Sequence, residues 1–90
     1  MEITVERSGG FAGLRSTTRT IATDRLESSD RTRVESLAGD LSADVRAPEG
    51  ADQFQYDLTV TRGDDVRTYR FYGEENAASD LISEVFRIGT

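Results

Sequence analysis

A glycine-rich run near the N-terminus constrains this chain more than any other feature. Three glycines fall within five positions, with one large aromatic residue among them, in the order Ser8, Gly9, Gly10, Phe11, Ala12, Gly13. Glycine is favoured where the backbone takes a positive φ or where another surface must come close to it. A tight turn needs only two such residues. The run therefore predicts a loop that displays Phe11, with the alternative that Phe11 folds back onto the core.

The segments on both sides of this run have the character of β-strands. Ile3 and Val5 alternate with polar residues over 1–6, which is typical of a half-buried strand. Residues 14–23 are rich in threonine and arginine and poor in large apolar side chains, which predicts a strand in a more exposed position. The two strands are expected to form an antiparallel hairpin with the glycine run at its tip.

Apolar spacing in the rest of the chain predicts two further strands and two helices. The clearest strand is 53–61, in which every second residue from Phe54 to Val60 is apolar, and it is expected to be central in the sheet. A turn at 62–65 leads into a returning strand over 66–72. Apolar residues at i, i+3 and i+4 spacing predict helices over 28–44 and 74–87.

The boundaries of the first helix are open at the sequence level. Ser28 or Ser29 can act as its N-cap, whereas Thr32 and Glu35 match a capping box one turn later. The helix is expected to end near 42–44, with Gly39 inside it at a cost of about 1 kcal/mol relative to alanine.

The element order ββαββα predicts one small domain over residues 1–90. Helices packed on one face of a sheet give a two-layer α+β fold, here with a four-stranded, mainly antiparallel sheet. One core is expected to bring together apolar residues of the third strand and both helices: Val34, Leu37, Leu41, Phe54, Tyr56, Leu58, Leu81, Ile82, Val85 and Phe86.

The chain contains no cysteine and no histidine. Disulfides, thiolate nucleophiles, zinc–thiolate sites and imidazole general bases are thereby excluded. Asp64 and Asp65 lack the spacing of a calcium loop. The candidate carboxylates for a pair of catalytic acids are scattered over different elements and are interpreted as solvated surface groups: Asp24, Asp40, Asp44, Asp52, Asp57, Asp64 and Asp65. We therefore expect no enzyme activity, no cofactor and no metal site.

The net charge of −6 makes nucleic acid an unfavourable partner. No apolar run is long enough to span a bilayer, and the N-terminus lacks the pattern of a secretory signal, so a cytoplasmic location is expected. All eleven basic residues are arginine. An acidic, lysine-free surface is suited to a saline cytoplasm, and a GC-rich genome is the alternative explanation.

Two stretches of the chain resemble one known family. The run from Arg7 to Leu14, which follows a short N-terminal strand, and the stretch Ala51-Asp52-Gln53-Phe54-Gln55-Tyr56-Asp57-Leu58-Thr59-Val60 are similar to the emfourin family. The resemblance covers nearly the whole chain in the same element order. This chain departs from the family pattern at the end of its last helix, residues 87–90, and at the entry to its first helix, residues 27–29.

The resemblance implies a small protein that inhibits thermolysin-like zinc metallopeptidases. For such a partner, the residues of the glycine run lead us to expect that the Ser8–Gly13 loop enters the cleft of the protease, with Phe11 as the anchor in an apolar pocket and with Gly9 and Gly10 close to the cleft wall. Free of its partner, the protein is expected to be a monomer. Asp52 belongs to the resembling stretch, and either a hydrogen bond to the loop backbone or a partner contact would explain it. The alternative function is a small structural or protein-interaction domain with no protease partner.

Overall fold

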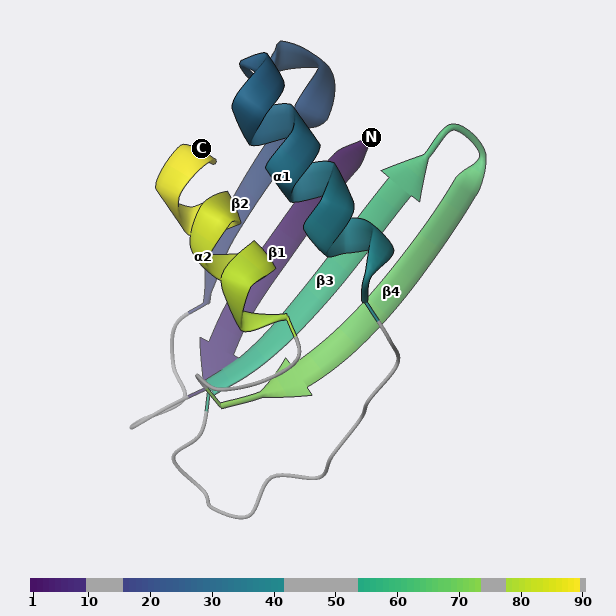
Figure 1. Cartoon of the computed structure of the whole chain (residues 1–90). Coiled ribbons are helices and arrows are strands. Elements are labelled where there is room, and N and C mark those ends of the chain that lie inside the picture. The colour runs from purple at the N-terminus through teal and green to yellow at the C-terminus, as the bar shows by residue number, and fades with distance from the viewer. Residues whose placement is uncertain (10–15, 42–53, 74–77, 90) are drawn as a thin grey trace.

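The computed structural model describes residues 1–9, 16–41, 54–73 and 78–89 of the chain. These residues form the predicted order ββαββα, with a short 3₁₀ helix, η1, between the second strand and the first helix (Figure 1). In this part of the chain, no helix is long and apolar enough to cross a membrane. The elements are β1 (Glu2–Gly9), β2 (Thr17–Ala22), η1 (Thr23–Arg25), α1 (Ser28–Gly39), β3 (Phe54–Arg62), β4 (Asp65–Tyr72) and α2 (Ser79–Ile88).

The four strands form one sheet in the order β2-β1-β3-β4. All three neighbouring pairs are antiparallel, so the predicted hairpin of the first two strands is confirmed. β3 occupies an inner position, as expected from its apolar face. β2 lies at an edge, which agrees with its threonine- and arginine-rich sequence. β1 is the second inner strand and pairs along its length with both β2 and β3.

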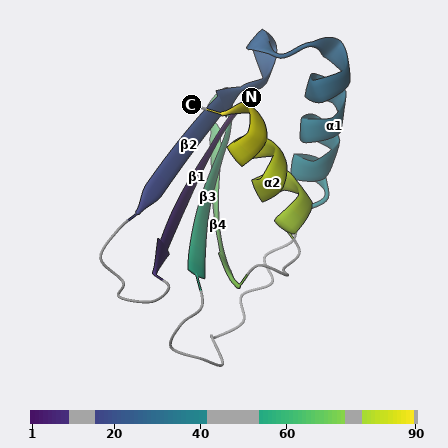
Figure 2. The ribbon, with the colours of Figure 1, turned by 90° about the vertical axis from the view of Figure 1, so that its left-hand side faces the viewer.

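Both helices lie on one face of the sheet, as predicted (Figure 2). Alternation places Ile3 and Val5 of β1 on the covered face, where both are fully buried. The core between sheet and helices contains Ile3, Val5, Ile21, Val34, Ala38, Tyr56, Leu58, Val60, Phe71, Ala78, Leu81, Ile82 and Val85. Leu37, Leu41, Phe54 and Phe86 pack against it and are partly buried, so the expected core set is confirmed.

The start of α1 differs from both predicted caps. The helix begins at Ser28, and Glu27 occupies the N-cap position without a side-chain hydrogen bond. Thr32 lies inside the helix, where its hydroxyl donates to the carbonyl oxygen of Ser28 at 2.9 Å. Glu35 does not close a capping box, because its Oε2 accepts a 2.9 Å hydrogen bond from the hydroxyl of buried Thr23. A contact with η1, distant in sequence, thus replaces the local capping pattern.

The end of α1 comes earlier than predicted. Gly39 is the last helical residue rather than an interior one. The next residue, Asp40, has φ −88° and ψ −1°, and its N–H donates to Leu37 and Ser36 carbonyl oxygens at 3.3 and 3.2 Å. Glycine has low helix propensity, so the helix stops where glycine would have weakened it.

α2 is also shorter at its start than the predicted helix. It begins at Ser79, and Ala78 precedes it with non-helical backbone angles. The remaining residues of the predicted start, 74–77, lie outside the described part of the chain. The β3–β4 turn falls at Gly63 and Asp64, as predicted, and Gly63 has a φ of 56°.

Candidate functional site

The glycine run joins β1 to β2 at one end of the sheet. The pairing register places Gly9, the last residue of β1, opposite Phe54, the first residue of β3. Arg7 stands opposite Thr17, the first residue of β2. Gln55 stands opposite Tyr72, the last residue of β4. All four strands therefore begin or end at this end of the sheet. We call this end, which runs across the strands, the loop edge.

Two of the six residues predicted to bind a partner lie in the described part of the chain. Ser8 and Gly9 are the final residues of β1 and pair with Gln55 and Phe54, so β1 extends beyond the predicted strand and into the glycine run. Gly9 has a φ of 88°, a conformation that residues with a Cβ adopt at a cost. The positive φ of the backbone thus explains why glycine occupies position 9. The other four residues lie outside the described part of the chain: Gly10, Phe11, Ala12 and Gly13. Both the displayed and the packed position of Phe11 therefore stay predictions.

A cluster of aromatic and arginine side chains lies behind the loop edge on the covered face. The Cζ atom of Arg7 is 5.1 Å from the ring centroid of Phe54 and 5.1 Å from that of Phe86 in α2. The Cζ atom of Arg19, from β2, is 5.7 Å from the same Phe86 ring. These distances are within the range of cation–π contacts. The cluster connects β1, β2, β3 and α2 next to the start of the glycine run.

Sequence reasoning missed this cluster. Arg7 continues the alternation of Ile3 and Val5, so a predicted strand one residue longer than 1–6 would have placed it on the covered face. Phe86 was assigned to the core only as part of an apolar stripe. The contact between them depends on where α2 crosses the sheet, which the sequence period does not specify.

The uncovered face of the sheet at the loop edge carries a polar network. Arg70 Nε donates to Asp57 Oδ1 at 2.8 Å, and Gln55 Nε2 donates to Asp57 Oδ2 at 2.9 Å. The hydrogen bond to Asp57 raises the pKa of Arg70. Asp57 is therefore an ion-paired acceptor between two strands and not a candidate acid.

The other predicted surface carboxylates do not assemble into a site. Asp65 accepts a 3.1 Å hydrogen bond from Arg67, which raises the pKa of that guanidinium. Asp24, Asp40 and Asp64 are exposed and belong to different elements or turns. Asp44 and Asp52 lie outside the described residues. Within the described ranges, no group of three or more acidic side chains is placed to hold a metal ion.

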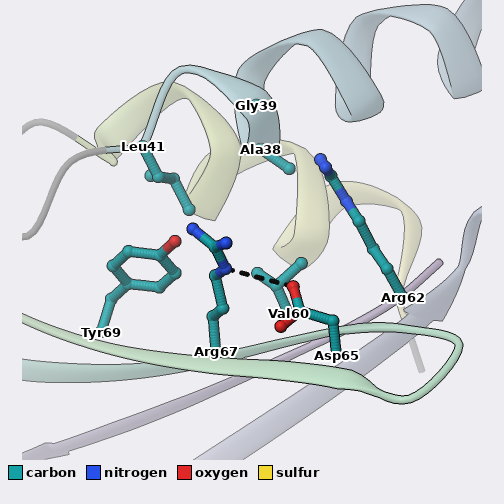
Figure 3. Close-up of a pocket in the computed structure, with 8 residues that line it drawn as sticks. All are labelled: Ala38, Gly39, Leu41, Val60, Arg62, Asp65, Arg67 and Tyr69. Atoms are coloured by element: carbon teal, nitrogen blue, oxygen red, sulfur yellow. Dashed lines mark hydrogen bonds and ion pairs between the residues drawn. The ribbon is translucent and has the colours of Figure 1, made fainter.

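One small pocket lies away from the loop edge, between the end of α1 and the β3–β4 hairpin (Figure 3). Its volume is about 140 Å³. Arg67 and Tyr69 point into it from β4, and Arg62 reaches toward Gly39 at the end of α1 (Figure 3). Since α1 has no basic residue in its last turn, Arg62 places a cation near the negative end of that helix dipole. We assign Arg62 this structural role.

The fold and the loop edge define a small two-layer α+β domain whose glycine run extends from an inner strand. The Emfourin family model matches residues 5–87, nearly the whole chain, and the chain belongs to the emfourin family. No curated protein and no solved structure matches it. Membership of this family suggests a metallopeptidase inhibitor with a protease as its partner, and it implies that the protein is not an enzyme.

Proposed function

We propose that this protein inhibits thermolysin-like zinc metallopeptidases by inserting the Ser8–Gly13 segment into the active-site cleft. The observation that carries the proposal is the family match, which includes this segment. The geometry at its root agrees with it. Ser8 and Gly9 are held by β3 in register, so the segment starts from an inner strand of a four-stranded sheet. A rigid root reduces the ordering cost of binding.

The proposed mechanism is occlusion rather than capture of the zinc ion. The chain has no histidine or cysteine to replace a protein ligand of zinc. In the proposed complex, Phe11 fills the apolar pocket beside the metal, and Gly9 and Gly10 allow the backbone to pass close to the cleft wall. The proposal also places the protein in the cytoplasm as a monomer when free.

Inhibition kinetics test the proposal directly. The purified protein is expected to inhibit thermolysin competitively with respect to a small peptide substrate, because both occupy the cleft. A serine protease assayed with the same preparation is the control and should keep full activity. Full activity of several thermolysin-like enzymes at high inhibitor concentration would contradict the proposal and favour a protein-interaction domain without a protease partner.

A further inference from the structure

Arg7 and Arg19 approach each other on the covered face of the sheet, next to the loop edge. Arg7 of β1 stands opposite Thr17 of β2, and Arg19 is two residues further along β2 on the same face. Such diagonal neighbours lie about 7–8 Å apart between Cα atoms. Their guanidinium groups both contact the ring of Phe86, at 5.1 and 5.7 Å. Two positive charges thus share one aromatic ring.

Neither of these arginines has a carboxylate partner among the described residues. Four other arginines, Arg33, Arg67, Arg70 and Arg87, each lie within 3.2 Å of a carboxylate oxygen. Arg19 donates one hydrogen bond, to the carbonyl oxygen of Thr18 at 3.1 Å. Twelve of the seventeen acidic residues lie in the described part of the chain, and none of these twelve forms an ion pair with Arg7 or Arg19.

The contacts with the rings restrain both guanidinium groups, and the Thr18 carbonyl oxygen is the one acceptor that the described residues give their N–H groups. A guanidinium that stacks on a ring uses its face, whereas its N–H donors point outward in the plane. Both side chains are half-buried, so they are less free than arginines at the surface. A planar carboxylate is the acceptor that best matches such a fork of donors, and it would also relieve the repulsion between the two cations.

We propose that Arg7 and Arg19 form a docking site for one carboxylate side chain on the surface of the metallopeptidase, beside its cleft. The inference depends on the proposed function for the identity of this partner. The site lies next to the end of β1, where the Ser8–Gly13 segment begins. Insertion of this segment into the cleft would therefore bring the two arginines to the rim of the cleft. The two adjacent positive charges give this site, in a chain of net charge −6, the electrostatic complementarity that binding of a carboxylate needs.

Arginine-to-methionine variants test the docking site in the complex. Methionine keeps an unbranched apolar stem against Phe86 and removes the charge. Arg19→Met and Arg7→Met are each expected to raise the inhibition constant for thermolysin about ten-fold or more, and to weaken its dependence on salt. Arg25→Met is the matched control, because Arg25 is an exposed arginine of η1 at the opposite end of β2. It should change the constant by less than about two-fold.

The outcomes separate this site from the proposed function. If the parent protein inhibits and Arg19→Met inhibits equally well, or if Arg25→Met has the same effect, the docking site is refuted and the inhibitor assignment stands. If the parent protein does not inhibit, the proposed function fails, and titration with succinate decides the carboxylate site. The arginine Nε–H resonances of Arg7 and Arg19 should then shift with saturation while that of Arg25 does not. Equal, non-saturating shifts of all three would overturn the site.

Discussion

Gly9 stands directly opposite Phe54 in the pairing of β1 with β3, with a φ of 88°. The glycine run therefore begins inside the sheet and not after it. The same pairing places the start of the glycine run beside Phe54, whose ring contacts the Arg7 guanidinium. A change of backbone conformation at Gly9 should accordingly affect both the sheet and the segment that follows.

Replacement of Gly9 by alanine tests the role of its backbone conformation. Gly9→Ala is expected to lower the free energy of unfolding by about 1–2 kcal/mol, because a Cβ disfavours positive φ. It should also raise the inhibition constant. Denaturant unfolding and inhibition of thermolysin measure the two effects.

Gly39→Ala is the matched control for Gly9→Ala. Gly39 is helical, and the nearest atom to an added Cβ is a guanidinium nitrogen of Arg62 at 4.0 Å. Alanine there should be neutral or should stabilise the protein by up to about 1 kcal/mol. Equal stability losses in the two variants would show that the conformation at Gly9 is not what requires glycine.

Phe11→Ala distinguishes an anchor from a core residue. If Phe11 is displayed, the variant should keep nearly the full free energy of unfolding and lose about 2 kcal/mol or more of binding free energy for the protease. If Phe11 packs in the core, the variant should lose about 3–5 kcal/mol of stability. Phe54→Ala serves as the comparison, since Phe54 packs against the core and the Arg7 guanidinium. A stable Phe11→Ala protein with unchanged inhibition would refute the anchor role.

Glu84 should give the protein a stability that depends on acid pH. Its carboxylate accepts hydrogen bonds from Arg87 at 3.1 Å and from Arg33 of α1 at 3.2 Å, and the bond from Arg87 is the main cause that lowers the pKa of Glu84. A lowered pKa in the folded state stabilises the protein above the unfolded pKa of about 4.3, and this stabilisation is lost as the pH falls through the folded value.

Glu84→Gln is expected to cost about 1 kcal/mol at neutral pH and little at a pH below both pKa values. Unfolding free energies measured by denaturant across this range provide the test. Asp64→Asn is the control, because Asp64 is an exposed turn residue without an ion pair among the described residues, and it should leave the profile nearly unchanged. A Glu84→Gln profile parallel to that of the parent would contradict the prediction.

Gly89→Ala tests the close approach of the end of α2 to β2. An added Cβ would lie 2.5 Å from the carbonyl oxygen of Val85, 3.2 Å from Cβ of Arg19 and 3.3 Å from Cγ2 of Ile21. Since backbone must move to relieve the first contact, we expect a loss of about 1–3 kcal/mol in unfolding free energy. Thermal or denaturant unfolding measures it, and stability equal to that of the parent would show that the end of α2 moves without cost.

The sequence by itself determined the layers of this protein. Alternation at Ile3 and Val5, and again from Phe54 to Val60, identified the buried faces of the inner strands, because side chains in a strand alternate strictly between faces. The threonine-rich composition of β2 predicted a more exposed strand, and the sheet order places that strand at an edge. The apolar spacing of Leu81, Ile82 and Val85 identified the face of α2 that covers the sheet.

Only the tertiary structure decided the element ends and the cluster behind the loop edge. β1 continues through Gly9 because β3 supplies hydrogen-bonding partners there, and no local pattern encodes that partner. Glu35 likewise accepts a hydrogen bond from Thr23 and closes no capping box, because packing brings in a partner twelve residues away that no local pattern encodes. Arg7 and Arg19 meet at Phe86 because strand register and helix position together bring three distant residues to one place. Periodicity specifies which face a residue occupies, whereas packing specifies its neighbour.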